Sequence, residues 1–234
     1  MEKMTTIIRD TDQDELLKRA AQALCGELRG VLAERGRAVL GVPGGRSVAR
    51  IFGAMRQERL DWDRVHVFLV DERLVPTGHP DSNFRLLREH LLDPLAREGR
   101  TPPHAHPFPG DAPDPERAAR EYGRALAELG ARFDVVLLSS GEDGHVASLF
   151  PDHHSVMDAR QGFLVMDDAP KPPLGRMSAS ASLVRACGVG VLLFTGRAKA
   201  TAFARFMEPS TPVSSCPAKL VLRMESPYVF TDLE

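Results

Sequence analysis

Short apolar runs alternate along the chain with longer amphipathic segments, and this alternation constrains the fold more than any other feature. Each run is nearly continuous in apolar residues, as are strands buried on both faces of a parallel sheet. The pattern predicts strands at residues 38–42, 65–70, 133–139, 189–194 and 219–223. It predicts helices at residues 11–35, 47–58, 82–92, 115–129 and 197–207. Strands that alternate with helices indicate a three-layer α/β/α fold with a doubly wound, mostly parallel central sheet.

Two proline-rich segments, residues 97–115 and 167–176, interrupt this pattern. Strands and helices resume with the same rhythm after the first, so we expect loops there rather than a boundary between domains. One domain over residues 1–234 is the simplest organisation. Ser47 and Asp114 stand where helices are expected to begin, and both residue types favour the N-cap position.

The composition excludes several classes of function. The chain has 234 residues and a net charge of −2, so a basic face for nucleic acid is not expected. Its first residues lack the apolar stretch of a signal peptide, and no apolar run reaches the length of a membrane span. The three cysteines, Cys25, Cys187 and Cys216, fit neither a disulfide framework nor a zinc site. We therefore expect reduced thiols in a cytoplasmic protein.

A polar cluster follows each of four predicted strands. The clusters are PGGRS after residues 38–42, DER after 65–70, GEDGH after 133–139 and TGRAKA after 189–194. The carboxyl ends of parallel strands meet at one edge of a sheet, and open α/β sheets bind their ligands there. We therefore expect the four clusters to lie together in one cleft.

The glycine-rich cluster of Gly44, Gly45, Arg46 and Ser47 has the features of a phosphate-binding turn. Glycines let backbone N–H groups converge on an anion, and the start of a helix adds a partial positive charge. The cluster matches neither the P-loop nor the dinucleotide-binding fingerprint. An ordinary strand-to-helix turn is the alternative, and these residues alone do not choose between the two.

Basic residues later in the chain are candidates for the same ligand. Lys199 stands early in a predicted helix after a glycine turn, where an ammonium group can reach a phosphate. Lys171 and Arg176 stand on the stiff segment 167–176, and the Arg176 guanidinium suits bidentate contact with phosphate oxygens. Simple exposure at the surface is the alternative for each of these side chains.

Asp71, Glu72 and Arg73 follow the second predicted strand directly. Asp71 is the first polar residue there and is expected to point into the cleft. Glu72 is expected to form only a salt bridge within the loop. Ser82 and Asn83 begin the next predicted helix, where capping is the commonest use of such residues.

The segment SSGEDGHVASLFP, residues 139–151, has the strongest catalytic pattern. His145 lies just past a turn flanked by Gly141 and Gly144, two residues after Asp143. Histidine is the usual general base near neutral pH, and a nearby carboxylate holds its tautomer and favours its protonated form. A structural histidine in a local turn is the alternative. The three other clusters expected at the same edge favour the catalytic interpretation.

No metal site is expected from the remaining histidines. His153 and His154 are adjacent, and neighbouring residues do not share a side in most backbones, so both are interpreted as ordinary loop residues. His104 and His106 lie in the proline-rich segment 97–115 and are interpreted in the same way. A serine nucleophile is not expected either, because the chain has no G-x-S-x-G motif.

Taken together, these segments resemble a known family. The motifs of 6-phosphogluconolactonases are similar to GGRS, VFLVDERLVPTGHPDSNFRLL, GEDGHVASLFP, APKPPLGRMSAS and TGRAKA, in this order and at similar spacing. The most specific of these is GEDGHVASLFP, whereas GGRS and TGRAKA are shared with related sugar-phosphate isomerases and deaminases. The resemblance covers nearly the whole chain. It implies a Rossmann-like domain that hydrolyses 6-phospho-D-glucono-1,5-lactone to 6-phosphogluconate in the oxidative pentose phosphate pathway, with no required cofactor.

The resemblance also implies roles for single residues. His145 matches the proposed base that activates water, and Asp143 would orient it. Asp71 and Arg73 would line the sugar end of the substrate. The phosphate would be held by the residues that match the family's phosphate loop and its positive anchors, namely Gly44, Gly45, Arg46, Ser47, Arg176 and Lys199.

The chain departs from the family pattern at two places. Ser139 and Ser140 stand where a Leu-Gly pair is more usual, and their hydroxyls either contact the substrate or only change the turn. Arg46 stands where many relatives have Ser or Thr, which puts the individual phosphate contacts in question but not the site.

Two other functions are weighed beside the lactonase. Glucosamine-6-phosphate deaminases resemble the same motifs but carry a Glu-Pro pair where this chain has Phe150-Pro151, and an apolar ring cannot transfer protons. A regulator that only binds a sugar phosphate is the second alternative. Such regulators usually need a DNA-binding module, and nothing in the sequence indicates one. We expect a monomer whose partner is a small sugar-phosphate lactone.

Overall fold

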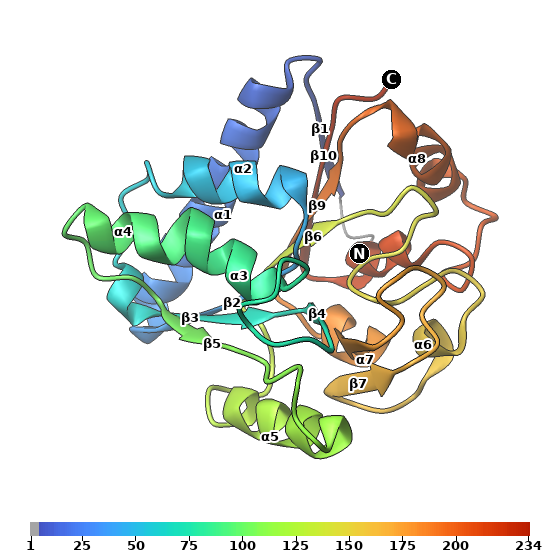
Figure 1. Ribbon diagram of the computed structural model, residues 1–234. Coiled ribbons are helices and arrows are strands. Elements are labelled where there is room, and N and C mark those ends of the chain that lie inside the picture. The colour runs from blue at the N-terminus through green and yellow to red at the C-terminus, as the bar shows by residue number, and fades with distance from the viewer. Residues whose placement is uncertain (1–4) are drawn as a thin grey trace.

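Four of the five predicted apolar runs form the centre of a seven-stranded parallel sheet in the computed structural model, which describes residues 5–234 (Figure 1). The order of the strands across the sheet is β1-β10-β9-β6-β2-β3-β5. Their bounds are Thr6–Arg9 for β1, Ala38–Val42 for β2, Val65–Leu69 for β3, His104–His106 for β5, Val135–Ser139 for β6, Val189–Phe194 for β9 and Ser226–Thr231 for β10. The α/β class and the mostly parallel sheet predicted from the sequence are confirmed.

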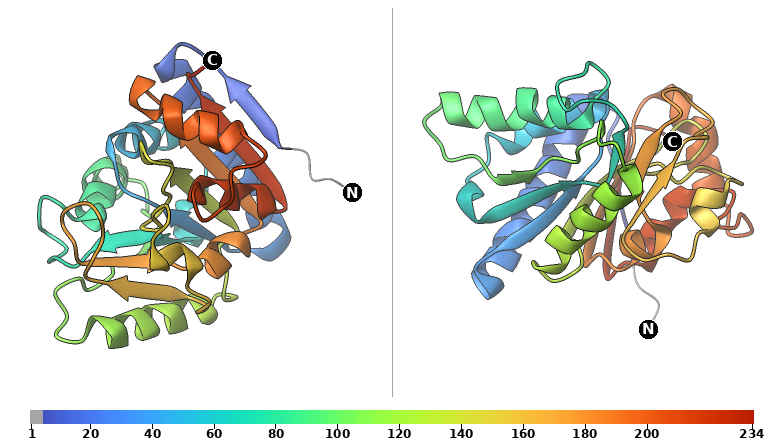
Figure 2. Two further views of the ribbon diagram at one scale, coloured as in Figure 1. Left: turned by 90° about the vertical axis from the view of Figure 1, so that its right-hand side faces the viewer. Right: turned by 60° about the horizontal axis from the view of Figure 1, so that its bottom comes forward.

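Helices cover both faces of this sheet (Figures 1 and 2). On one face lie α1 (Gln13–Arg35), α2 (Arg46–Met55), α3 (Asn83–Leu87) and α4 (Asp93–Arg97), with a π-helical stretch at Arg88–Leu92 joining the last two. On the other face lie α5 (Pro115–Ala127) and α7 (Ala181–Arg185). Two further helices are α6 (His154–Met157) and α8 (Ala200–Met207). None of the helices in residues 5–234 combines the length and apolarity that a membrane crossing requires.

The direction in which the chain adds strands reverses once. It proceeds outward from β2 through β3 to β5, and then crosses over and proceeds from β6 through β9 to β10 in the opposite direction. The reversal falls between β2 and β6, which are neighbours in the sheet. In folds of this kind the crevice for a ligand forms at the carboxyl ends of the strands beside the reversal. The loops after β2 and β6 are those that carry Gly44 and His145.

A second, smaller sheet was not predicted. Its three antiparallel strands are β4 (Asp71–Arg73), β8 (Arg176–Ala179) and β7 (Phe163–Met166), in the order β4-β8-β7. The pairing of β4 with β8 places Arg73 opposite Arg176. It therefore joins the polar residues after β3 to the end of the proline-rich segment 167–176.

Other expectations about single elements were wrong. Residues 219–223 lie in a 3₁₀ helix, Pro217–Arg223, and the last strand is β10. A short buried apolar run has the same pattern in a strand and in a helix, so periodicity does not separate the two. The strands β1 and β5, which are short and lie at the two edges of the large sheet, were not predicted either.

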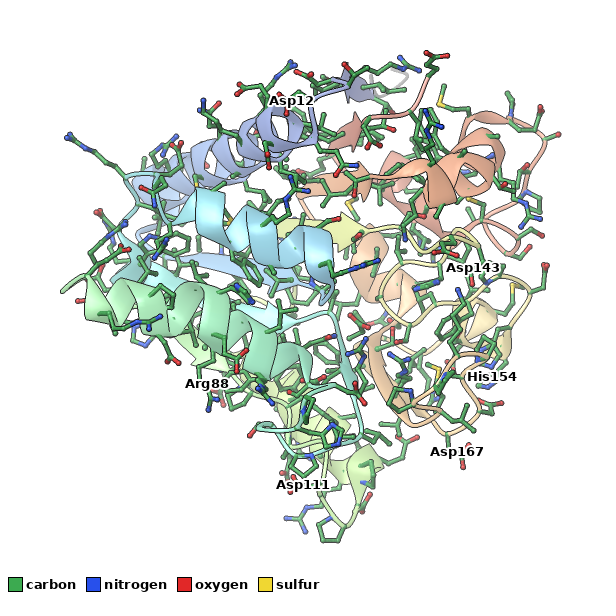
Figure 3. The ribbon with its side chains drawn as sticks, turned by 45° about the horizontal axis from the view of Figure 1, so that its top comes forward. Asp12, Arg88, Asp111, Asp143, His154 and Asp167 are labelled. Atoms are coloured by element: carbon green, nitrogen blue, oxygen red, sulfur yellow. The ribbon has the colours of Figure 1, made fainter. Side chains whose placement is uncertain are left out.

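The helix caps agree in part with the sequence. The side chain of Asp114 accepts a hydrogen bond from the backbone N–H of Arg117 and caps α5, as predicted. Asp12 caps α1 in the same way (Figure 3). Ser47 is not a cap, because α2 begins one residue earlier and Gly45 is its N-cap residue. The hydroxyl of Ser47 is therefore available for other contacts.

Candidate active site

A cleft of about 690 Å³ opens at the carboxyl ends of the strands beside the reversal in strand order. All four predicted polar clusters contribute to its lining, so their expected convergence is confirmed. The predicted site residues that line it are Gly44, Gly45, Arg46, Ser47, Asp71, Arg73, His145, Arg176 and Lys199. A second depression of about 600 Å³ lies between α5 and α7, but its lining holds no histidine or carboxylate. The first cleft is therefore the candidate site.

His145 and Asp143 form a hydrogen-bonded pair at the bottom of the loop after β6. The ring nitrogen Nδ1 of His145 lies 2.6 Å from Oδ1 of Asp143, and the same oxygen accepts the backbone N–H of His145 at 3.1 Å. Asp143 itself is not part of the cleft lining. Because Asp143 holds Nδ1, Nε2 is the ring nitrogen left to act on a molecule in the cleft.

The turn that carries this pair depends on Gly141. Its backbone N–H donates to the backbone oxygen of His145 at 2.8 Å, which closes the loop. A Cβ atom at Gly141 would lie 2.0 Å from Nδ1 of His145 and 2.7 Å from Oδ1 of Asp143. Any side chain at this position would therefore displace the histidine–aspartate pair.

Lys171 completes the surroundings of Asp143. Its Nζ lies 2.8 Å from Oδ2 of Asp143, the oxygen that His145 does not use. Burial alone would raise the pKa of the Asp143 carboxyl, but hydrogen bonds and positive charge from His145 and Lys171 outweigh it and hold that pKa well below its usual range. The carboxylate therefore stays ionised wherever the protein is folded in mildly acidic or neutral solution.

The side chain of Asn83 supports the loop after β2. A Cβ atom at Gly44 would lie 1.8 Å from Oδ1 of Asn83, so the glycine permits the backbone to rest on this buried amide. Nδ2 of Asn83 in turn donates to the backbone oxygen of Asp71 at 2.8 Å. Asn83, which the sequence suggested only as a helix cap, thus joins the loop after β2 to the one after β3.

A second link joins the loop after β2 to the loop after β9. The hydroxyl groups of Ser47 and Thr195 lie 2.8 Å apart. The backbone N–H of Gly196 donates to both carboxylate oxygens of Asp232, at 2.9 and 3.0 Å. The loop that carries Lys199 is therefore anchored on one side at the start of α2 and on the other near the end of the chain.

We expected Glu72 to form a salt bridge within its loop, and this expectation was wrong. It is buried and accepts hydrogen bonds from the backbone N–H groups of Arg73, Asn83 and Phe84 and from the hydroxyl of Ser82. Burial raises the pKa of Glu72 in spite of these four donors. Glu72 therefore fixes the start of α3 beneath the cleft. The predicted cap at Ser82 is confirmed, since its hydroxyl accepts the backbone N–H of Arg85.

Asp71 is buried and lines the cleft, as predicted. Its Oδ2 accepts a hydrogen bond from the hydroxyl of Ser148 at 3.3 Å. Ser148 lies in the segment that follows His145, so this contact ties the loop after β6 to β4. Asp71 and Asp143 thus occupy different parts of the loop cluster.

Six cationic side chains line the cleft: Arg46, Arg73, Lys171, Arg176, Arg197 and Lys199. Arg176 is buried and also donates to the backbone oxygens of Lys171, Pro172 and Pro173, so it shapes the proline-rich segment from within. Burial and the neighbouring charge of Arg73 lower the pKa of Arg176. Burial likewise lowers the pKa of Lys199. This accumulation of positive charge favours an anionic ligand.

The structure adds Lys171 and Phe150 to the site. Both line the cleft, and the ring of Phe150 lies 4.9 Å from the ring of His145, centroid to centroid. Phe150 is buried. The sequence placed Lys171 on a stiff segment but gave no signal that this segment folds back onto Asp143.

We expected the adjacent side chains of His153 and His154 not to share a side of the backbone, and this expectation was wrong. Their rings lie side by side, 4.1 Å apart between centroids, and both Nε2 atoms approach Oδ1 of Asp168, at 3.4 and 3.0 Å. Asp152, just before them, has a left-handed backbone with φ of 54°. His153 and His154 follow this sharp turn at the start of α6 and do not alternate as in a strand. His104 and His106 lie in β5 rather than in a loop.

Fold and cleft together define a Rossmann-like α/β protein with a histidine–aspartate pair in a cation-lined site. The model of the family described as glucosamine-6-phosphate isomerases/6-phosphogluconolactonase matches residues 11–230. The chain belongs to this family. The resemblance inferred from the sequence motifs is therefore confirmed.

Individual relatives agree with this assignment. A 6-phosphogluconolactonase of Pseudomonas aeruginosa is 38% identical over 183 residues, which cover 76% of this chain and 75% of the relative. A 6-phosphogluconolactonase of Synechocystis is 31% identical over 213 residues, which cover 88% of this chain and 86% of the relative. The crystal structure of a 6-phosphogluconolactonase from Shewanella baltica has a TM-score of 0.85 and 27% identity, covering 100% of this chain and 99% of that one. A monomeric glucosamine-6-phosphate deaminase reaches a TM-score of 0.78 at 18% identity, which reflects the shared fold alone.

Proposed function

We propose that this protein is a 6-phosphogluconolactonase, which hydrolyses 6-phospho-D-glucono-1,5-lactone to 6-phospho-D-gluconate in the oxidative pentose phosphate pathway. The observation that carries the proposal is the His145–Asp143 pair, which faces a cleft lined by six cationic side chains. The names of relatives that are 38% and 31% identical support it. The substrate requires both parts of this arrangement, because it has a phosphate to anchor and a carbonyl to be attacked by water.

The phosphate would lie against the loop after β2. Gly44 and Gly45 leave the backbone N–H groups at the start of α2 free to face an anion. Arg46 and Lys199 line the cleft beside this loop, and the Ser47 hydroxyl stands next to Thr195. Arg176 would add charge from the proline-rich segment. The dianion would thus be bound by dipoles and cations together.

His145 would act as the general base. Nε2 takes one proton from a water molecule as the water oxygen bonds to the lactone carbonyl carbon, and a tetrahedral oxyanion forms. The bond from this carbon to the ring oxygen then breaks, and the imidazolium returns the proton to the departing ring oxygen. The products are the hydroxyl and carboxylic acid groups of 6-phosphogluconate. Asp143 stabilises the imidazolium between the two transfers and holds its orientation.

The sugar end of the substrate would meet Asp71 and Arg73. Asp71 suits hydrogen bonding to sugar hydroxyl groups, because its carboxylate only accepts. Arg73 lines the cleft. A guanidinium or a backbone N–H near the carbonyl would stabilise the developing oxyanion.

The decisive experiment is a coupled assay with freshly generated 6-phosphogluconolactone, with the spontaneous hydrolysis rate subtracted. Wild-type protein should accelerate hydrolysis, and His145→Ala should lower kcat by about 10²–10⁴-fold, the usual contribution of general acid–base catalysis. His90→Ala, which removes an exposed histidine on the π-helical stretch, serves as the matched control. Equal rates for His145→Ala and wild type would place the base elsewhere.

A parallel assay separates this function from that of a deaminase. Glucosamine 6-phosphate is incubated with the protein, and released ammonia is measured. We expect no enzymatic release, because Phe150 offers no carboxylate for ring opening or proton transfer. Ammonia release at enzymatic rates would refute the lactonase proposal.

The remaining parts of the proposal concern the setting of the reaction. We propose a single-domain monomer in the cytoplasm that needs no cofactor for the chemistry given above. The three cysteines are buried and free, as suits a reducing compartment. Size-exclusion chromatography with light scattering tests the oligomeric state.

A further inference from the structure

A group of metal-binding residue types lies outside the cleft. It consists of His153 and His154, at the start of α6, and Asp168, two residues after the end of β7. Figure 3 shows His154 at the surface, on the side of the molecule that also carries Asp143. The function proposed above uses none of these three residues.

The spacing of the three side chains fits one metal ion. Nε2 of His154 lies 3.0 Å from both carboxylate oxygens of Asp168, and Nε2 of His153 lies 3.4 Å from one of them. The three ligand atoms all lie within 4.8 Å of one another. A tetrahedral zinc ion with bonds of about 2.0–2.2 Å to nitrogen and oxygen needs ligand atoms roughly 3.3–3.5 Å apart. Small rotations of exposed side chains complete this geometry.

His153 is oriented for such a role. Its Nε2 is buried and makes no hydrogen bond within residues 5–234, since the contact with Asp168 lacks hydrogen-bond geometry. Its Nδ1 lies 2.9 Å from the hydroxyl of Ser155. When Nε2 binds a metal, Nδ1 carries the proton and donates it to this hydroxyl, as ligating histidines do with a supporting acceptor. In this protonation state the backbone N–H of Ser155 loses its acceptor, because it otherwise donates to Nδ1 of His153 at 3.2 Å.

We propose that His153, His154 and Asp168 bind one divalent transition-metal ion of the Zn²⁺ class. Two imidazoles and one carboxylate suit zinc and its neighbours better than magnesium or calcium, which prefer oxygen ligands. The side chains of His154 and Asp168 are 58% and 57% exposed, so water has access to a fourth position. The site is distinct from the cleft and independent of the proposed reaction.

The ion would join two segments that shape the cleft. His153 meets the ring of Phe150 edge to face at 6.0 Å, and Phe150 packs on His145. On the other side, Asp168 lies near the start of the proline-rich segment that brings Lys171 to Asp143. A metal held by both segments would reduce their relative motion.

The test is metal binding measured by isothermal titration calorimetry with Zn²⁺ and by the visible absorption of bound Co²⁺. Wild-type protein should bind one ion. His154→Ala and Asp168→Asn should each weaken binding by at least about 10-fold. Both side chains are exposed, so these variants should fold normally, which circular dichroism checks. His90→Ala, which removes an exposed histidine elsewhere, should bind as wild type does.

Two further arms separate this site from the catalytic pair. His145→Ala should retain the binding of Zn²⁺, and the metal should slow hydrogen exchange in residues 167–176 of wild type but not of Asp168→Asn. The proposal is overturned if wild type shows no saturable binding, or if His154→Ala and Asp168→Asn bind as tightly as wild type. Loss of binding in His145→Ala alone would likewise overturn it and assign the ion to the cleft.

Discussion

Nζ of Lys171 lies 2.8 Å from Oδ2 of Asp143, whose other oxygen contacts Nδ1 of His145 at 2.6 Å. The carboxylate is thus shared between a fixed positive charge and the proposed base. Lys171 comes from a segment that follows β7, whereas the other two residues follow β6. The orientation of the proposed base is therefore linked to the position of a separate loop.

Replacing Lys171 by Gln should lower kcat by roughly 10-fold. Without the ammonium group, Oδ2 of Asp143 loses the contact that helps to fix the histidine–aspartate pair, and misplacement of catalytic groups by about 1 Å can cost up to about 10²-fold in rate. Lys171→Arg keeps the charge and should retain most of the activity. Steady-state kinetics on both variants decide the matter, and a Gln variant with wild-type kcat and KM would show that the contact has no catalytic importance.

Replacing Asp143 by Asn should lower kcat by about 10² or more and change KM little. The amide cannot stabilise the imidazolium, and it no longer selects the tautomer in which Nε2 accepts the proton. The same coupled lactone assay measures both constants. A large rise in KM at constant kcat would instead assign Asp143 to substrate binding.

Gly44→Ala should disrupt the loop after β2. The added methyl would meet the buried Asn83 amide, and overpacking of this kind typically costs about 1–3 kcal/mol in the free energy of unfolding. We also expect a higher KM, because the loop would move. Gly53→Ala in α2 is the matched control: no atom lies within 4 Å of the added Cβ, and alanine favours a helix by up to about 1 kcal/mol. Urea unfolding measures the free energy of unfolding of both variants. Equal values for Gly44→Ala and Gly53→Ala would contradict the predicted clash.

The histidines of β3 and β5 should make stability depend on pH. Burial, with the charges of His66 and His104, lowers the pKa of His106 to about 4. Between pH 4 and about 6.5 the unfolded chain therefore binds a proton that the folded protein does not, so the free energy of unfolding falls as pH decreases through this window.

The variant His106→Phe should reduce this loss by about 1 kcal/mol, less than the full pKa shift implies because the ring is half exposed. Phenylalanine keeps the stacking on Phe68, whose ring lies 4.0 Å from that of His106. Urea unfolding at pH 6.5, 5.5 and 4.5 measures the slope. A variant with the slope of wild type would show that other groups cause the pH dependence.

Much of the architecture was predictable because its central strands are buried on both faces. Their apolar runs are long enough to identify, and the rule for open sheets then places Gly44 and His145 in one cleft. The edge strands β1 and β5 are short and half polar, so they give no such signal. The small antiparallel sheet joins segments about 100 residues apart, and no local pattern reports that pairing.

The contacts that complete the site were beyond sequence reasoning for a similar reason. The contact of Lys171 with Asp143 depends on how a proline-rich segment folds back, and the four donors to Glu72 depend on the angle at which α3 starts. The common direction of His153 and His154 follows from a left-handed residue before them, which the residue type Asp does not specify. Each depends on backbone geometry that only tertiary structure fixes.

The position of β10 has a consequence for synthesis of the protein. β10 lies between β1 and β9, so the first strand of the chain has its partner only in the last one (Figure 2). A nascent chain that ends before residue 226 leaves β1 and the outer edge of β9 unpaired. The large sheet therefore cannot be closed on this side before β10 has been synthesised and has folded. Until then, the unpaired edge of β9 is exposed to misassociation.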